Sequence, residues 1–131
     1  MKLDRSALST RVFKTKVFGR WATREGLEDD SLLGAAREID SGLIDARLGG
    51  QVLKKRIALP GRGKRGGART LVAFSQGQRC IFVYGFAKNE RENIDNRALV
   101  ALQTMAKRLL DLPDEDLVKS LQSGESIEIE E

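Results

Sequence analysis

The sequence predicts an α+β fold with N-terminal helices packed on a small antiparallel β-sheet, followed by a C-terminal helix. Two observations predict it: the hydrophobic period is 3.6 over residues 16–41 and 95–110, and it changes to 2 over residues 52–87. The resulting order, β-α-α-β-β-β-α, is typical of an antiparallel sheet with its helices largely on one face. With 131 residues and 40% apolar residues, the chain is long enough for one such domain but not for two.

The N-terminal third is expected to form a strand over residues 11–15 and helices over residues 16–25 and 28–41. Thr15 is a suitable N-cap for the first helix, because its hydroxyl can accept from a free backbone amide. Gly26 is a suitable residue to end that helix. The acidic residues that follow favour the start of the second helix, where the helix dipole is positive.

Three strands are expected next, over residues 52–59, 70–74 and 79–87. A four-residue turn that contains Gly77 joins the last two strands. Both faces of the third strand are apolar, which predicts a central strand covered on both sides. Strict alternation puts Cys80, Phe82, Tyr84 and Phe86 on one face and Ile81 and Val83 on the other.

The C-terminal part is expected to form a helix over residues 95–110, capped by Asp95 or the next residue, and a short helix over residues 114–121. Residues 122–131 are either loosely ordered or an added edge strand. We therefore divide the chain into a main domain, residues 1–112, and an acidic C-terminal extension, residues 113–131.

Charge is segregated along the chain. The segment from Ala46 to Asn89 holds ten Lys or Arg residues and no acid, whereas residues 111–131 carry a net charge of −7. The whole chain carries only +4. A concentrated basic surface of this kind favours a phosphate polymer as partner.

Within the basic segment, Lys54 and Arg56 share one face of a strand, while Lys55 points the other way. Arg69 begins the adjacent strand and can lie across the hairpin from Lys54 and Arg56. Such cations on an edge strand can serve solubility alone. Like charges opposed across strands repel each other, however, and this arrangement is better explained if phosphate binds among them.

The segment between these strands is expected to be a glycine-rich loop that carries Arg62, Lys64 and Arg65. These cations are either merely solvated or contact a nucleic-acid backbone. The glycines match G-x-G-x-x-G in letters, but the match opens into a strand and not a helix, so it does not indicate a dinucleotide site.

Several classes of site are disfavoured. The chain has one cysteine and no histidine, which makes a zinc site improbable, and the basic segment lacks the paired carboxylates of a metal-dependent nuclease. No cofactor is therefore expected. The longest apolar run, residues 80–87, is far too short to span a membrane, and the N-terminus lacks a signal-peptide pattern, so a cytoplasmic protein is expected.

Two motifs resemble the RelE/HigB-type toxins of bacterial type II toxin–antitoxin systems. They are GGARTLVAF and IFVYGFAKNERENI, the second followed by a helix that ends in KRLLDL. The upstream segments FKTKVFGRWA, LGAAREIDSGL and LGGQVLKKRIALPGRGKRGG are similar to the HigB-like branch. The resemblance covers residues 11–112. It implies a RelE-like fold, cleavage of messenger RNA in the ribosomal decoding site, and a protein antitoxin as partner.

The resemblance also implies site residues. Lys54, Arg56, Arg69 and Lys88 are the expected catalytic cations, and Lys55, Arg62, Lys64, Arg65 and Arg91 are the expected RNA contacts. Three positions depart from the family pattern: Ala68 replaces a tyrosine, Asn89 replaces a second arginine, and no C-terminal catalytic tyrosine is present. The chain's single tyrosine, Tyr84, lies mid-strand and is expected to pack.

The chemistry implied by this resemblance needs no histidine. The RNA 2′-hydroxyl attacks its own phosphorus, fixed guanidinium groups stabilise the charge that develops on the phosphate oxygens, and a lysine serves as the proton acceptor. Two other functions stay open: a ParE-type toxin directed at gyrase and a non-catalytic nucleic-acid-binding module. For inhibition we favour an antitoxin over the alternative that the acidic tail folds across the basic surface, because exposed ion pairs are weak at physiological salt.

Overall fold

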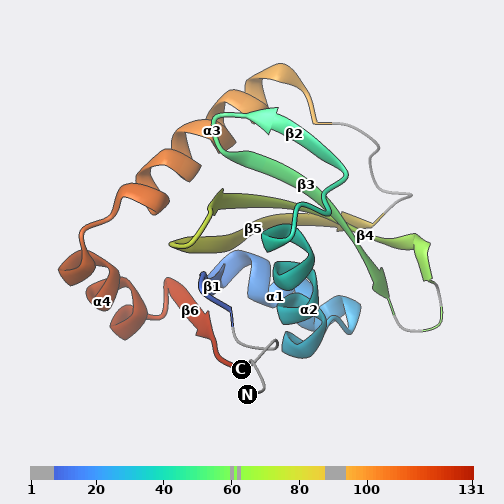
Figure 1. The fold of residues 1–131 in the computed structure, drawn as a ribbon, viewed down its shortest axis with the longest axis horizontal. Helices are drawn as coiled ribbons and strands as arrows, with labels where there is room; N and C mark the ends of the chain where they lie inside the picture. The colour runs from blue at the N-terminus through green and yellow to red at the C-terminus, as the bar shows by residue number, and fades with distance from the viewer. Residues whose placement is uncertain (1–7, 60, 62, 88–93) are drawn as a thin grey trace, which may run out of the picture.

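A computed structural model describes residues 8–131 except 60, 62 and 88–93, and it gives no side chains for residues 63–66. The described part is a six-stranded sheet in the order β2-β3-β4-β5-β1-β6, with helices packed on it (Figure 1). Neighbouring strands are antiparallel except for β1 and β5, which are parallel. The α+β fold is thus confirmed. The elements are β1 (Arg11–Thr15), α1 (Lys16–Glu25), α2 (Asp29–Asp40), β2 (Ala46–Gly49), β3 (Val52–Leu59), β4 (Gly63–Ser75), β5 (Arg79–Ala87), α3 (Asn96–Asp111), α4 (Asp114–Ser123) and β6 (Ser126–Ile129).

The helix ends follow the local capping rules. The Thr15 hydroxyl accepts from the backbone N–H of Phe18 at 3.1 Å, and Gly26 ends α1 with φ +76°. A carboxylate oxygen of Asp95 accepts from the N–H of Ala98 at 2.8 Å at the start of α3. These caps confirm the predicted boundaries of α1 and the predicted start of α3.

The helices cover both faces of the sheet, so the expectation that they lie largely on one face is wrong. Helices α1 and α2 pack with Leu53, Val72 and Phe82 on one face. Helices α3 and α4 pack with Leu71 and Ile81 on the other. We call these the α1/α2 face and the α3/α4 face. The apolar residues on both sides of β5 require this double cover, because either face left open would expose them to water.

A β-bulge in β5 changes which side chains share a face. Leu71 pairs with Tyr84, and the next residue, Val72, pairs with Phe82, so Val83 is an extra residue in the ladder. The alternation predicted for this strand is therefore wrong beyond Val83. Tyr84 lies on the α3/α4 face with Ile81, and Phe86 follows it there, whereas Phe82 stays on the α1/α2 face.

Two further differences concern the basic segment. Residues 46–49 form a short strand, β2, that was not predicted, and β4 begins at Gly63, well before the expected residue 70. Leu59 pairs directly with Gly63 across the β3–β4 hairpin. Most of the expected glycine-rich loop is therefore strand, and Gly63 and Ala68 pair with Leu59 and Ile57 of β3 on either side of an irregularity.

The acidic tail belongs to the sheet. Residues 126–129 form the edge strand β6, which pairs with β1, and Ile129 is buried beneath α1 and α2. Nη2 of Arg11 lies 2.8 Å from Oε1 of Glu128, and the two side chains form an ion pair. The alternative that the tail covers the basic surface is wrong, because β6 lies at the edge of the sheet opposite β2 and β3 (Figure 1). None of the helices described is both long and apolar enough to cross a membrane.

Candidate nucleic-acid interface

The α3/α4 face carries a row of cations next to aromatic rings. Arg56 on β3 lies opposite Arg69 on β4, and Arg69 lies opposite Phe86 on β5. In the neighbouring row, Lys54 lies opposite Leu71, which pairs with Tyr84. We call Lys54, Arg56 and Arg69 the basic row. This arrangement is the one predicted from the alternation of residues in β3 and from the place of Arg69 at the start of the next expected strand.

The two arginines of the basic row are unequally engaged. Asp45 accepts from the backbone N–H of Arg56 at 2.6 Å and from its Nε at 3.0 Å. Burial raises the pKa of Asp45, but these hydrogen bonds and the nearby charges of Arg56 and Lys55 outweigh burial and lower it overall. Half-buried Arg69 donates from Nη1 to the carbonyl of Gly67 at 3.3 Å, which fixes its guanidinium near the strand.

Asp45 was missed in the sequence because it stands one residue before the acid-free segment. The β2–β3 hairpin brings it back beside Arg56, where its N–H also donates to the carbonyl of Lys54 at 3.0 Å. Half-buried Lys54 has no ion-pair partner among the described residues. Lys54 therefore adds a positive charge to this end of the sheet that no described ion pair offsets.

Lys55 lies on the α1/α2 face, away from the basic row. Its Nζ is 2.7 Å from Glu38 on α2 and donates to the carbonyl of Leu43 at 2.8 Å, with 5% of the side chain exposed. Lys55 therefore joins the end of α2 to β3. The expected RNA contact from Lys55 is wrong for this fold, because its ammonium is enclosed and already paired.

The structure describes the other expected site residues only in part. Lys88, Arg91 and Arg62 lie outside the described residues, as does Asn89. Lys64 and Arg65 lie on β4 by their backbone, without described side chains. The structure thus brings Lys54, Arg56 and Arg69 together, and it leaves the roles of the remaining cations as predictions.

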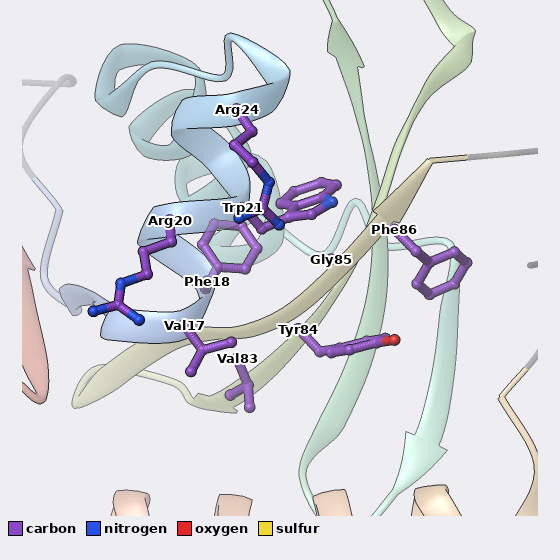
Figure 2. A pocket seen from close by; sticks show the side chains of 9 residues that line it. All are labelled: Val17, Phe18, Arg20, Trp21, Arg24, Val83, Tyr84, Gly85 and Phe86. Carbon is purple, nitrogen blue, oxygen red and sulfur yellow. The ribbon is translucent and has the colours of Figure 1, made fainter. Parts of the chain in front are cut away.

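A hollow of about 720 Å³ opens between α1 and the part of β5 around Gly85. Figure 2 shows Arg20 and Arg24 extending from α1, and Tyr84 and Phe86 extending from β5. The rings of Tyr84 and Phe86 lie 5.9 Å apart. The rings point away from α1, because Gly85, which lies between them on β5, faces Trp21. Sequence reasoning missed the hollow, because the approach of α1 to Gly85 depends on tertiary packing.

Gly85 allows α1 to approach β5 at this hollow. A Cβ added to Gly85 would lie 2.3 Å from the Trp21 ring, so any other residue would displace the indole. The Nε1 of Trp21 is buried, and no hydrogen-bond partner for it occurs in the described part of the chain. Close packing of Trp21 on β5 therefore fixes the position of α1, and with it Arg20 and Arg24.

Other reactive groups offer no site. Cys80 is buried in the core, and burial raises the pKa of its thiol to about 12, which keeps it protonated and unreactive. Within the described ranges, no three side chains of His, Cys, Asp or Glu gather in a way that could hold a metal ion.

Comparison with known proteins identifies the family. A search of curated proteins finds no match to this chain. The family model described as the RelE toxin of the RelE/RelB toxin–antitoxin system matches residues 10–129, which span β1 to β6. This match covers nearly the whole described fold, the cations of the basic row included. The chain therefore belongs to the RelE toxin family and is a toxin component of a toxin–antitoxin system.

Proposed function

We propose that this toxin is a ribosome-dependent messenger RNA endoribonuclease of the HigB-like branch, which inhibits translation in the cytoplasm. The observation that carries the proposal is the cross-strand pair Arg56 and Arg69, with Lys54 on the same face. Directly opposed like charges destabilise a sheet, and a bound phosphate would relieve that repulsion. Family membership supports the toxin role, and the motifs quoted above support the branch.

In the proposed reaction the RNA 2′-oxygen forms a bond to the adjacent phosphorus as the bond from phosphorus to the 5′-oxygen breaks. The products are a 2′,3′-cyclic phosphate and a free 5′-hydroxyl. Arg69, with Arg56 beside it, stabilises the negative charge on the non-bridging oxygens. Lys54 accepts the proton of the 2′-hydroxyl and a proton is returned to the departing 5′-oxygen, and Lys88 stays a second candidate for this role. No metal is needed, because the nucleophile belongs to the substrate.

The reaction also depends on alignment. The 2′-oxygen, phosphorus and leaving oxygen must lie in line, and holding them so lowers the barrier without any strong acid or base. A ribosome that holds the messenger RNA in its decoding site supplies this alignment.

We also propose two kinds of partner contact. Arg62, Lys64, Arg65 and Arg91 are proposed as further RNA contacts. A protein antitoxin is proposed as the inhibitor, because β6 holds the acidic tail at the far edge of the sheet, away from the basic row.

A cleavage assay on translating ribosomes tests the proposal. Purified toxin is added to ribosomes stalled on a defined messenger RNA, and 5′ ends are mapped by primer extension. We expect cuts within the decoding-site codon that appear only when ribosomes are present. Gyrase-dependent DNA damage without RNA cuts would instead establish a ParE-type toxin. If neither RNA cuts nor DNA damage appears, the protein is a non-catalytic binding module. The pairing of Arg56 with Asp45 would suit such a module.

A further inference from the structure

The β-bulge in β5 sets the direction of Tyr84. Strict alternation from Phe82 would place Tyr84 on the α1/α2 face, but the extra residue Val83 turns it to the opposite face. The next residue, Gly85, faces Trp21, so Tyr84 extends from β5 on the side away from α1 (Figure 2). Bulges commonly lie next to active sites, where they re-aim a single side chain. The side chain re-aimed here is the chain's only tyrosine.

The bulge places this ring beside the basic row. Tyr84 pairs with Leu71, which in turn pairs with Lys54. Arg69 pairs with Phe86, two residues further along β5, so Tyr84 and Arg69 are diagonal neighbours on one face. Diagonal neighbours lie about 7–8 Å apart, within reach of an aromatic ring and a long side chain. The phosphate and the base of one nucleotide can therefore contact Arg69 and Tyr84 at the same time.

The ring of Tyr84 is packed on one side and is not fully covered. Its centroid lies 5.9 Å from that of Phe86, with an angle of 44° between the two planes. Phe86 is 3% exposed, whereas Tyr84 is partly exposed. Phe86 therefore limits the orientations of Tyr84, as close packing does in a protein interior. A partly exposed, oriented ring next to cations suits a ligand that carries both a flat ring and a negative charge.

We propose that Tyr84 stacks on the base of the nucleotide whose phosphate lies at Arg69, and that this contact selects where the toxin cuts. The inference rests on the proposed function, which places the scissile phosphate at Arg69. Cations alone hold phosphates without regard to the base. Aromatic side chains, in contrast, recognise single-stranded RNA by stacking on its bases. A purine offers a larger ring surface than a pyrimidine, so we expect cleavage next to a purine to be favoured.

Stacking is tested without cleavage by using 2′-O-methyl RNA, which lacks the attacking hydroxyl. Tyr84 is the only tyrosine and Trp21 the only tryptophan, so labelling these residue types gives NMR signals from one ring on each side of β5. The full chain is titrated to saturation with a 2′-O-methyl triadenylate and with an abasic trinucleotide of the same charge. We expect the Tyr84 ring signals to move upfield with the triadenylate only, because a stacked base shields the ring, while the Trp21 signals stay in place.

Tyr84 signals that do not move, or that move equally with the abasic trinucleotide, overturn the inference. In the second case the RNA is held by its phosphates and not by its bases.

Three variants then test the effect on cutting. Tyr84→Leu removes the ring, and Tyr84→Phe keeps the ring and removes only the hydroxyl. Phe13→Leu is the control for lost packing, since Phe13 is fully buried on the same face. Cuts are mapped on ribosomes over a messenger RNA that contains all codons.

Tyr84→Leu should cleave purine sites about 5-fold less or worse, because the stacking contact is lost, and its preference for purines should disappear. Tyr84→Phe should match the wild type. Phe13→Leu should keep the wild-type distribution of cuts even where its total cleavage falls. A uniform loss at all codons in Tyr84→Leu, as in the control, would show that Tyr84 only packs. An equal loss in Tyr84→Phe would assign the effect to the hydroxyl and overturn stacking.

These experiments distinguish this inference from the proposed function. A wild-type protein whose Tyr84 signals move with the triadenylate but that cuts nothing on ribosomes has the base site and is not the proposed nuclease. A protein that cuts on ribosomes, with no response of Tyr84 in either experiment, is the nuclease and lacks the base site.

Discussion

Two neighbouring lysines on β3 show how differently one basic segment is used. Lys55 is enclosed on the α1/α2 face by Glu38 and the carbonyl of Leu43. Lys54, one residue earlier, lies on the α3/α4 face in the row of Arg56 and Arg69, with no ion-pair partner in the described part. The first lysine stabilises the fold, and the second adds to a repulsive cluster. Cations that are uncompensated by the fold are the better candidates for binding a phosphate.

The largest expected effect is a loss of RNA cleavage when an arginine of the basic row is removed. Arg69→Ala should lower the rate of ribosome-dependent cleavage by about 100- to 1000-fold, because a fixed donor to the developing charge is lost. Its melting temperature should stay close to that of the wild type, since the side chain lies in a half-buried cluster of like charge. Single-turnover cleavage and a thermal melt measure the two quantities. A folded Arg69→Ala protein that cleaves at the wild-type rate would remove Arg69 from the mechanism.

The next prediction compares the two lysines by substituting methionine at each position. Lys55→Met should lower the free energy of unfolding by about 1–3 kcal/mol, because Glu38 and the Leu43 carbonyl lose their partner. Lys54→Met should change stability by no more than about 0.5 kcal/mol. In urea unfolding, the two variants should therefore separate clearly.

RNA cleavage should reverse that order. Lys54→Met should lower cleavage by about 100-fold or more if Lys54 exchanges a proton with the reacting oxygens. Lys55→Met should cleave normally at a temperature where it is folded. Equal losses of cleavage in both variants would contradict the assignment of Lys54 to the reaction and of Lys55 to the stability of the fold.

The smallest effect concerns the acid that partly neutralises the basic row. The pKa of Asp45 lies below its ordinary value of 3.8 in the folded protein. Its carboxylate therefore contributes stability that is fully present above that value and is lost as the pH falls through the lower, folded pKa. Asp45→Asn should be less stable than the wild type at pH 7, and the difference should shrink as the pH falls below 3.8. Urea unfolding at several pH values measures it, and a constant difference would contradict the role assigned to Arg56.

Local interactions made much of the fold predictable. Thr15 and Asp95 supply oxygens to free amides within their own helices, and Gly26 takes a positive φ that few other residues adopt. Each such signal acts within a few residues and needs no partner elsewhere. The facing of Arg56 and Arg69 was likewise predicted, because alternation in β3 fixes the face of Arg56 and Arg69 stands where the next strand was expected to begin.

Features that depend on distant partners were not predictable in this way. Strand β2 is short and carries little strand pattern, and it forms because β3 offers it backbone hydrogen bonds. The bulge at Val83 arises from the pairing of β5 with β4, and no local signal in residues 79–87 announces it. That bulge decides the face of Tyr84 and Phe86, and it therefore places both rings beside the basic row.

The sequence by itself determined the fold class, the helix ends and the concentration of positive charge between residues 46 and 89. Only the tertiary structure decided which of those charges are available. Lys55 is enclosed because α2 brings Glu38 to it, and Arg56 is held because the β2–β3 hairpin returns Asp45 to its side. Whether a cation is solvated, paired or left among like charges depends on groups far away in the chain, because electrostatic energy follows distance in space and not separation in sequence.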